Sequence, residues 1–596
     1  MALTKSEFDL LNLFRVKRAS DNITQRVVSE ALSISLGKVN GLVSGLREKG
    51  LLTDPKEGCE ITVKGLEALK PHKVNNAIIM AAGMSSRFAP LSYECPKGLL
   101  NVKGEILIER EIRQLHEAGI TDITVVAGYM KEKFFYLEEK FGVNIVVNED
   151  YYQYNNTSTL IRMIDKLSNT YICSSDNYFV DNVFEPYVYQ GYYSAVYSTG
   201  DTDEYCLKCD SHGRITGVDI GGSNSWYMIG HVYFDKQFSD RFKEILVKEY
   251  EKPETRNGLW EDLYIKHIKE LNLHIKKYDA DKVMEFDSLD ELRKFDDEYI
   301  NNADSAILKN ICNVLSCEMK DITQIKAIKA GLTNTSFQFV VNGQGYVYRH
   351  PGNGTSKYIN RKSEAFSMDV AARLGLDDTF IYIDENEGWK ISKFIKNARE
   401  LDYNNRAEVD EALKMMRKLH DKKIVSEYDF GIWDKTEEFI KRLDELGKSD
   451  FEDFKDLYNT MSELKDVVMK DDNAVKCLCH NDCYSPNFLL DEDNKMYLID
   501  WEYSGNDDPA SDLGTFICCS EYTFDEAVEI IKQYLGKEPS KSELAHYIGY
   551  VSIAAYYWYV WALYQETRGN AVGEWLYMWY KNSKLYCKEA MKLYNR

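Results

Sequence analysis

The chain is poor in proline, lacks the cysteine spacing of a disulfide framework, and has fewer cations than anions. Ten prolines among 596 residues, with 44% hydrophobic and 29% charged residues, give the composition of a globular protein. The length predicts more than one domain. The thirteen cysteines are odd in number, and no signal peptide opens the chain, so we expect reduced thiols in the cytoplasm.

Long uncharged segments are also scarce. The one long run, Tyr547–Tyr564, is rich in tyrosine and tryptophan, which predicts a buried aromatic helix and no membrane span. The net charge of −22 excludes a protein that coats nucleic acid along its whole length. Residues 1–73 differ from the rest, because they carry 12 Lys and Arg against 9 Asp and Glu.

The first 72 residues have the spacing of three short helices, at Lys5–Lys17, Thr24–Leu32 and Ser35–Lys49, followed by a polar turn and a strand at Cys59–Val63. This order resembles a winged helix domain of the multiple-antibiotic-resistance-regulator type. The resemblance implies DNA readout by Ser35, Lys38, Asn40 and Arg47. The alternative is a docking or dimerising module. Because the net charge here is only +3, we expect no tight sequence-specific DNA binding.

A nucleotide-binding pattern follows the first segment. A short apolar run, Ala77–Met80, ends in the small residues Ala81–Gly83, and two cations follow at Arg87 and Lys97. Small residues after a strand let backbone N–H groups approach a triphosphate, while cations neutralise its charge. Further strand patterns alternate with helical ones and lie at Ile123–Val126, Ile145–Val147 and Tyr171–Cys173. The segment therefore predicts a doubly wound α/β sheet with a site after its first strand.

The stretch from Ala81 through Pro96–Lys97 resembles the signature of nucleotidyltransferases. Asp150–Asn156, Ser175–Tyr178 and Leu259–Glu261 resemble the bacterial CTP:phosphocholine cytidylyltransferases in particular. The resemblance implies Mg²⁺ ligands at Asp176 and Glu261, although the family is expected to carry Asp where this chain has Glu261, followed by Asp262.

The same resemblance implies several other functional residues in this segment. Lys97 and Arg87 are expected to act in catalysis by neutralising the triphosphate. The implied nucleotide-binding residues are Ala81, Ala82, Gly83, Asn156 and Ser158. The implied substrate contacts are Tyr205 and Trp260, for which ordinary packing is the alternative.

The segment with the most chemical information is His480–Asn487, followed by Ile499–Glu502. It reads His-Asn-Asp, four further residues and Asn, and then Ile-Asp-Trp-Glu. Phosphoryl transfer needs a base for a hydroxyl beside rigidly placed metal ligands. The order therefore predicts Asp482 as the base, with Asn487 and Asp500 as Mg²⁺ ligands.

A zinc or redox cluster is the alternative for the neighbouring residues Cys477, Cys479, His480 and Cys483. A structural zinc site normally needs a second ligand pair, and none stands at a compatible distance in the sequence. We therefore expect reduced core cysteines on a strand that leads into the catalytic loop.

From residue 299 onward the pattern resembles choline and ethanolamine kinases of the aminoglycoside-phosphotransferase group. The resemblance is carried by Gly331–Phe337, Tyr346–Arg349, Asn360–Glu364 and Pro509–Gly514. It implies that Arg349 binds phosphate and pairs with Glu364. The implied ATP-binding loop contains Asn334, Thr335 and Ser336.

A tryptophan pair bears on the substrate of this last segment. Trp558 and Trp561 are three residues apart, which places them on one face of a helix. A trimethylammonium group cannot donate hydrogen bonds, so aromatic faces and nearby acids must hold it. Choline kinases carry a similar pair, and the resemblance implies Trp558, Trp561 and Glu502 as substrate contacts. An aromatic core helix is the alternative.

The sequence thus predicts a multidomain α/β and α+β protein. A winged helix-turn-helix domain at 1–72 precedes a nucleotidyltransferase domain at 73–298 and a choline kinase-like, two-lobe domain at 299–596. The resemblances imply phosphorylation of choline by ATP and then cytidylyl transfer from CTP to phosphocholine. The alternatives are the same reactions on ethanolamine or another amino alcohol, and a metabolite-sensing DNA-binding regulator. The oligomeric state stays open.

Overall fold

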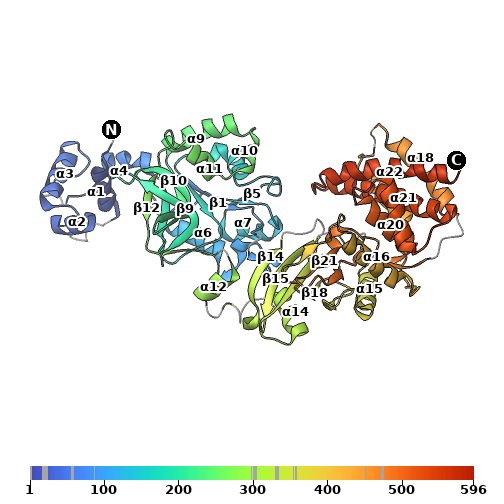
Figure 1. The fold of residues 1–596 in the computed structure, drawn as a ribbon. Coiled ribbons are helices and arrows are strands. Elements are labelled where there is room, and N and C mark those ends of the chain that lie inside the picture. Colours follow the sequence, from blue (N-terminus) through green and yellow to red (C-terminus); the bar gives the residue numbers. More distant parts are fainter. Residues whose placement is uncertain are drawn as a thin grey trace. The chain divides into compact units, whose positions relative to one another are not determined.

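The structure is a computed structural model that describes residues 3–16, 24–54, 59–85, 88–286, 288–296, 299, 305–328, 334–352, 355, 359–449, 452–470 and 476–595. The chain folds as two compact units, Met1–Ile307 and Leu308–Arg596 (Figure 1). Among the described residues, none of the helices has both the length and the apolar character that a bilayer crossing requires.

The first unit begins with four helices: α1 Lys5–Val16, α2 Gln25–Leu32, α3 Leu36–Glu48 and α4 Val63–Leu69. The three helices predicted from apolar spacing are confirmed to within one residue at each end. Thr24 and Ser35 act as N-caps, since their side chains accept the backbone N–H groups of Val27 and Lys38. The predicted strand at Cys59–Val63 is wrong. Only an isolated bridge joins Leu52 to Ile61, and Thr62 caps α4 instead.

These helices pack on the domain that follows them. Tyr187 and Tyr189 pack against the same apolar cluster as Phe8 on α1. The ring of Phe8 lies 5.0 Å from that of His72, which stacks on Tyr189 at 5.3 Å between centroids. The Arg15 guanidinium lies 4.3 Å from the centre of the Tyr187 ring. The N-terminal helices are therefore joined to the central domain by side-chain packing as well as by the chain.

A nine-stranded sheet forms the centre of the first unit, with β10, β9, β11, β6, β1, β4 and β5 in order; β8 also pairs with β11, and β12 pairs with β8. The bounds are β1 Asn76–Ala81, β4 Ile123–Ala127, β5 Asn144–Val147, β6 Thr170–Ser174, β8 Tyr192–Tyr197, β9 Asp201–Cys209, β10 Ile215–Ser223, β11 Trp226–Phe234 and β12 His274–Lys277. The pairs β1–β4, β1–β6 and β4–β5 are parallel. The predicted strands within β1, β4, β5 and β6 are confirmed.

Helices and short strands complete this unit. They are α5 Leu91–Glu94, β2 Asn101–Val102, β3 Glu105–Ile106, α6 Leu107–Glu117, α7 Tyr136–Phe141, α8 Thr157–Arg162, β7 Asn177–Phe179, α9 Lys236–Glu249, α10 Pro253–Asn257, α11 Trp260–Lys266, β13 Val283–Glu285 and α12 Leu289–Phe295. The chain runs from β1 to β4 on one side and returns to β6 on the other. The carboxyl ends of β1 and β6 therefore flank a topological switch point, where ligands of such sheets bind.

The second unit begins with a five-stranded antiparallel sheet in the order β14, β15, β16, β18, β17. The bounds are β14 Thr323–Ile328, β15 Asn334–Val341, β16 Gln344–Pro351, β17 Phe380–Ile383 and β18 Lys390–Lys393. Two helices accompany this sheet, α14 Ala306–Leu315 and α15 Arg361–Leu374. Asn360 is the N-cap of α15, because its side chain accepts the N–H groups of Lys362 and Ser363.

The remainder of this unit is mostly helical. Its helices are α16 Arg406–His420, α17 Ile432–Glu445, α18 Phe454–Val468, α19 Pro509–Cys518, α20 Phe524–Leu535, α21 Lys541–Thr567 and α22 Glu574–Leu593. Its short strands are β19 Arg399–Glu400, β20 Cys477–Cys479, β21 Phe488–Leu490, β22 Met496–Leu498 and β23 Gly505–Asp507. The uncharged run Tyr547–Tyr564 lies in the buried helix α21, as predicted. Gly514 lets α19 approach α21, since a Cβ there would lie 2.6 Å from the Tyr550 carbonyl oxygen.

Candidate active sites

A polar pocket of about 220 Å³ opens at the switch point of the first unit. Residues from the loop after β1, from α8 and its approach, and from the end of β6 line it: Ala81, Ala82, Gly83, Lys97, Asn148, Tyr151, Asn156 and Asp176 among others. Four of the five predicted nucleotide-binding residues of this unit, Ala81, Ala82, Gly83 and Asn156, thus line the same pocket. Arg87 lies outside the described residues. Ser158 is fully buried and hydrogen-bonds Asn148 at 2.9 Å, one layer behind the pocket.

Lys97 and Asp176 form an ion pair in the lining of this pocket. The Lys97 Nζ lies 2.8 Å from the Asp176 Oδ2, with the lysine side chain 7% exposed and the aspartate 20%. Gly98 makes the approach possible, because a Cβ at that position would come within 2.7 Å of the Ser175 Oγ. In this arrangement the buried ammonium can bind an incoming triphosphate while the more exposed carboxylate binds a cation.

Glu261 lies at the start of α11 and is held from two sides. The Asn156 amide donates to its Oε2 at 3.2 Å, and the Tyr193 hydroxyl donates to its Oε1 at 3.1 Å. Burial raises the pKa of Glu261 to about 7, and these hydrogen bonds only partly oppose the shift. The Asn156 Oδ1 also accepts the Trp260 backbone N–H at 2.7 Å. Asn156 therefore positions the carboxylate as well as lining the pocket.

The aromatic residues predicted as substrate contacts differ in their surroundings. Trp260 is only 1% exposed and stacks on Tyr193 with 5.8 Å between ring centres, so packing accounts for its position. Tyr205 is more open, and its hydroxyl donates to the Asp262 Oδ1 at 3.2 Å. Each carboxylate at the start of α11 thus has its own tyrosine partner: Tyr193 for Glu261 and Tyr205 for Asp262.

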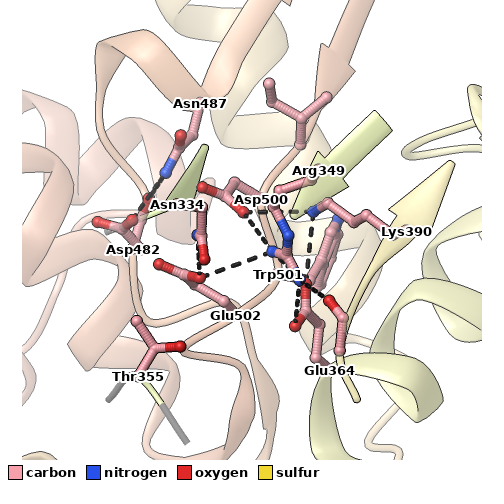
Figure 2. Close-up of polar contacts among 12 residues, drawn as sticks. Asn334, Arg349, Thr355, Glu364, Lys390, Asp482, Asn487, Asp500, Trp501 and Glu502 are labelled. Atoms are coloured by element: carbon pink, nitrogen blue, oxygen red, sulfur yellow. Dashed lines mark hydrogen bonds and ion pairs between the residues drawn. The ribbon is translucent and has the colours of Figure 1, made fainter. Parts of the chain in front are cut away.

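In the second unit, the loop between β20 and β21 brings Asp482 and Asn487 together. The Asn487 amide nitrogen donates to the Asp482 Oδ2 at 2.9 Å and to its carbonyl oxygen at 2.8 Å (Figure 2). Burial raises the pKa of Asp482 well above its usual range, and the negative charge of Asp500 adds to the rise. A carboxyl in this state accepts a proton more readily than an ordinary aspartate does.

Asp512, near the start of α19, anchors this loop and was not assigned a role from the sequence. Its two carboxylate oxygens accept the backbone N–H groups of His480 and Asn481, at 2.9 and 2.5 Å. The His420 Nε2 lies 2.8 Å from the Asp512 Oδ2. Although burial opposes it, the hydrogen bond with His420 lowers the pKa of Asp512, so a buried carboxylate fixes the loop. The Pro509–Gly514 motif was the available signal.

His480 supports Asp482 as a neutral imidazole. Its Nδ1 accepts the Asp482 backbone N–H at 3.2 Å, so its Nε2 carries the proton that is donated to the Ile499 carbonyl at 2.9 Å. Burial lowers the pKa of His480. Both ring nitrogens are thereby used, which contradicts the zinc alternative that included His480. Among the described residues, the cluster of His, Cys and acidic side chains that could hold a metal is instead His420, Cys479 and Asp512. Asp512 already has three hydrogen-bond donors as partners in this cluster and its surroundings.

A network of buried ion pairs lies next to Asp500 (Figure 2). The Arg349 guanidinium contacts both Glu364 oxygens, at 2.6 and 2.8 Å, and the Asp500 Oδ1 at 3.3 Å. The Lys390 Nζ lies 3.4 Å from the Glu364 Oε1 and 3.3 Å from the Asp500 Oδ1. Burial would raise the pKa of Glu364, but these cations hold it at about 2. The structure thus brings Arg349 and Glu364 together, and it adds Lys390, which sequence reasoning missed.

Glu502 belongs to the same network. Its Oε2 accepts the Asn334 amide at 2.8 Å and lies 3.6 Å from Arg349 and 3.7 Å from Arg361. The described contacts of Glu502 are therefore with the ATP-loop side of the site, whereas the sequence assigned it to the substrate. Asn334 is the first residue of β15, and Thr335 and Ser336 continue that strand opposite His350 and Arg349.

An aromatic cluster lies on α21, α22 and the two loops that carry Asp482 and Asp500. Trp558 meets both Trp561 and Tyr503 edge to face, with interplanar angles of 81° and 79°. Trp579 stacks on Trp558 with centroids 5.9 Å apart. Trp575 lies 5.5 Å from Trp579 and 6.3 Å from Tyr484, between ring centres. The predicted pair is thus part of a larger group, defined here as the aromatic cluster: Tyr484, Tyr503, Trp558, Trp561, Trp575 and Trp579.

Comparison with known proteins bears on both units. The choline/ethanolamine kinase family model matches residues 325–568, and the model of MobA-like NTP transferase domains matches residues 77–193. A 2-aminoethylphosphonate cytidylyltransferase from Lancefieldella rimae is 36% identical over 40% of this chain and 97% of its own. A choline-phosphate cytidylyltransferase from Streptococcus pneumoniae is 31% identical over 37% of this chain and 96% of its own. The structure of a choline kinase from Streptococcus pneumoniae is 22% identical over 48% of this chain and all of its own, with a TM-score of 0.42.

Proposed function

The chain belongs to the family of bacterial cytidylyltransferases, and on that premise we propose that it makes CDP-choline from choline in two steps. It is an enzyme that joins a kinase-type domain to a cytidylyltransferase domain. In the first step the choline hydroxyl oxygen bonds to the γ-phosphorus of ATP, and ADP leaves. In the second, a phosphocholine oxygen bonds to the α-phosphorus of CTP, and pyrophosphate leaves.

The observation that carries this proposal is the presence of both sets of chemical residues on one chain. A kinase makes a phosphate ester from an alcohol, and a cytidylyltransferase consumes such an ester. 2-Aminoethylphosphonate, named for one relative, has its phosphorus bonded directly to carbon, so phosphorylation of an alcohol does not make it. The kinase residues therefore favour an alcohol-derived phosphate ester as the substrate of the first unit.

In the kinase unit, Asp482 would take the proton of the choline hydroxyl as the oxygen attacks. Asn487 orients it by a hydrogen bond, and Asp512 fixes the loop that carries both. Asp500 is 35% exposed at its side chain and, with the Asn487 amide oxygen, offers the hard oxygen donors that Mg²⁺ prefers. When bound, Mg²⁺ would neutralise charge on the transferred phosphoryl group.

In the first unit, Lys97 would neutralise the CTP phosphates, and small residues after β1 would let the backbone approach them. Asp176 and Glu261 are carboxylates, which suit a Mg²⁺ ion that assists pyrophosphate departure. The residues proposed to bind the CTP phosphates in this way are Ala81, Ala82, Gly83 and Arg87.

The choice of choline rests on the aromatic cluster. A quaternary ammonium binds aromatic faces, and four indole rings stand near the two loops that carry Asp482 and Asp500. Ethanolamine is the second candidate, because the matching kinase family includes ethanolamine kinases. Its primary ammonium would need hydrogen-bond acceptors in place of ring faces.

Phosphorus NMR of the purified chain with Mg²⁺, ATP and CTP would test the proposal. Choline, ethanolamine and 2-aminoethylphosphonate are supplied in separate reactions. CDP-choline with release of both ADP and pyrophosphate supports the proposal. Cytidylyl transfer to 2-aminoethylphosphonate with no phosphorylation of either alcohol would refute it.

We further propose that the N-terminal helices are a docking module that does not read DNA tightly. Arg47 is paired with Asp54 at 2.6 Å, and α1 packs on Tyr187 and Tyr189 of the cytidylyltransferase domain. A metabolite-sensing regulator is the competing function. Nanomolar, sequence-selective DNA binding by the full chain in a mobility-shift assay at physiological salt would favour that regulator instead.

A further inference from the structure

We propose that the kinase unit carries a second ligand site, separate from its active site, for a small molecule that has both a ring and phosphate groups. The site is a cavity between α16 and the β21–β22 hairpin, and the residues that follow α15 complete its lining (Figure 1). It is defined here as the α16 groove. The proposed function uses neither this groove nor the side chains that line it.

The size and the floor of the α16 groove suit a small molecule. Its volume is about 710 Å³, which lies in the range of ligand pockets. Four apolar side chains that are at most 7% exposed form its floor: Leu376, Met415, Leu490 and Met496. Methionine thioethers make favourable contacts with aromatic rings, and aliphatic side chains pack on ring faces. The floor therefore fits the ring of a ligand.

The walls of the groove are rich in cations. Four cations line it from three elements: Arg399 on β19, Lys414 and Lys418 on α16, and Lys495 in the hairpin. Lys414 and Lys418 are four residues apart, so they lie on the same face of the helix. Two acids, Glu408 and Glu411, share the lining. A lining with more cations than acids contrasts with the net charge of −22 of the whole chain and favours an anionic ligand.

The three lysines of the groove are available to such a ligand. Within the described part of the chain, Lys418 takes part in no hydrogen bond or ion pair. Lys414 pairs with Asp410 at 2.6 Å, and Lys495 pairs with Asp378 at 2.5 Å. All four of these paired side chains are at least 41% exposed. Exposed pairs contribute about 0–1 kcal/mol, so either lysine can turn to a phosphate at little cost.

Glu408 does not oppose an anion, because Arg399 neutralises it within the wall. The Arg399 Nη2 lies 2.9 Å from the Glu408 Oε1, and its Nη1 donates to the Oε2 at 3.0 Å. The Asp402 backbone N–H also donates to the Oε2 at 3.0 Å. The hydrogen bond with Arg399 holds the pKa of Glu408 below its usual range. The three lysines therefore supply the positive charge that an incoming phosphate meets.

The groove is separate from the active site but shares an element with it. Neither Asn487 nor Asp500 lines the groove. The β21–β22 hairpin nevertheless joins them, since β21 begins directly after Asn487 and β22 ends two residues before Asp500. The Leu498 N–H donates to the Leu376 carbonyl at 2.9 Å, which ties this hairpin to the end of α15. Amide hydrogen exchange in residues 490–496 therefore reports whether the groove is occupied.

Hydrogen exchange of the full chain, followed by mass spectrometry, tests the site with four probes. CTP and CDP-choline carry a ring and phosphates, cytidine carries the ring alone, and pyrophosphate carries phosphates alone. CTP and CDP-choline should slow exchange in residues 490–496, and at equal concentration cytidine and pyrophosphate should have little effect there. Because the readout is confined to the groove, CTP bound in the first unit does not enter it.

A charge reversal in the groove provides the matched comparison. Lys418→Glu should raise the CTP and CDP-choline concentrations needed for protection by at least about tenfold, the size of one lost charged contact. Lys422→Glu makes the same change at an exposed lysine just beyond α16 that does not line the groove, and it should leave protection unchanged. KM for ATP should stay within about twofold of wild type in both variants, because neither lysine belongs to the active site.

Three outcomes would overturn the inference. The first is that no probe slows exchange in residues 490–496 of the wild type. The second is equal protection by pyrophosphate, which indicates an anion site with no use of the apolar floor. The third is an equal response of Lys418→Glu and Lys422→Glu, which indicates a general effect of charge. If Lys418→Glu melts early, Lys418→Ala is measured in its place. A chain that shows the expected contrast but makes no CDP-choline would refute the proposed function alone.

Discussion

Replacing Trp561 or Trp558 with phenylalanine should weaken choline binding while the kinase unit stays folded. Both indoles are buried, at 6% and 4% exposure, so alanine would open a cavity that costs about 3–5 kcal/mol of stability and would confuse the kinetics. Phenylalanine keeps a ring but gives a weaker cation–π face. Loss of about 1 kcal/mol from one face predicts an approximately fivefold higher KM for choline.

Each substitution also removes one hydrogen bond, and the effect of that loss must be separated. The Trp561 Nε1 donates to the Tyr503 hydroxyl at 3.2 Å, and the Trp558 Nε1 donates to the Thr515 Oγ1 at 3.3 Å. Tyr503→Phe removes the acceptor of Trp561 and retains every ring face, so it should lower the melting temperature slightly and leave the KM for choline nearly unchanged.

The assay is kcat/KM for choline and for ethanolamine, with KM for ATP measured in parallel. Wild type should prefer choline, because the N–H groups of ethanolamine would lose water without gaining enough acceptors among aromatic rings. The tryptophan variants should lose choline efficiency with unchanged KM for ATP. The reasoning is refuted if wild type prefers ethanolamine, or if both folded variants keep the wild-type KM for choline, since the aromatic cluster would then be packing alone.

Other predictions test the two active sites separately. Asp482→Asn should lower choline phosphorylation by about 10²–10⁴-fold and leave CDP-choline synthesis from supplied phosphocholine intact; equal loss of both reactions would contradict separate sites. Lys97→Ala and Asp176→Asn should abolish cytidylyl transfer and leave choline phosphorylation intact. Full cytidylyl transfer by Asp176→Asn in Mg²⁺ would exclude Asp176 as a metal ligand. Since burial raises the pKa of Glu261 to about 7, protons should compete with Mg²⁺ below that pH and weaken its apparent affinity by about tenfold per pH unit. Mg²⁺ titrations of cytidylyl transfer between about pH 6 and about pH 8 should show the slope, and a flat profile would count against Glu261 as a ligand.

Local signals predicted the elements that depend on neighbouring residues. Thr24 and Ser35 begin helices where the sequence places them, because a cap acts within three residues of itself. The same rule explains the error at Cys59–Val63. Thr62 offers its side chain to the Gly65 N–H and starts α4, although the apolar residues around it read as a strand.

The roles of Lys390 and Asp512 could not be predicted in the same way. Lys390 meets Arg349 across β16 and β18, and Asp512 meets His480 and Asn481 from α19. No periodic pattern links residues so far apart in the chain, and the Pro509–Gly514 motif marks the position of Asp512 without indicating its partners. The contact between Trp579 on α22 and Trp558 on α21 could not be predicted either, because no sequence pattern links the two helices. Motif spacing predicts which groups react, but tertiary pairing decides which cations and anions lie beside them.

The raised pKa of Asp482 links the proposed base to the nucleotide side of the kinase site. Burial is the main cause of the shift, and the charge of Asp500 is the next. Any cation that neutralises Asp500 removes this second contribution and leaves Asp482 more readily deprotonated. The same event frees Lys390 from one of its carboxylates. Arrival of the nucleotide with its cation would therefore favour the deprotonated form of Asp482, which is the form that can take the proton of the hydroxyl.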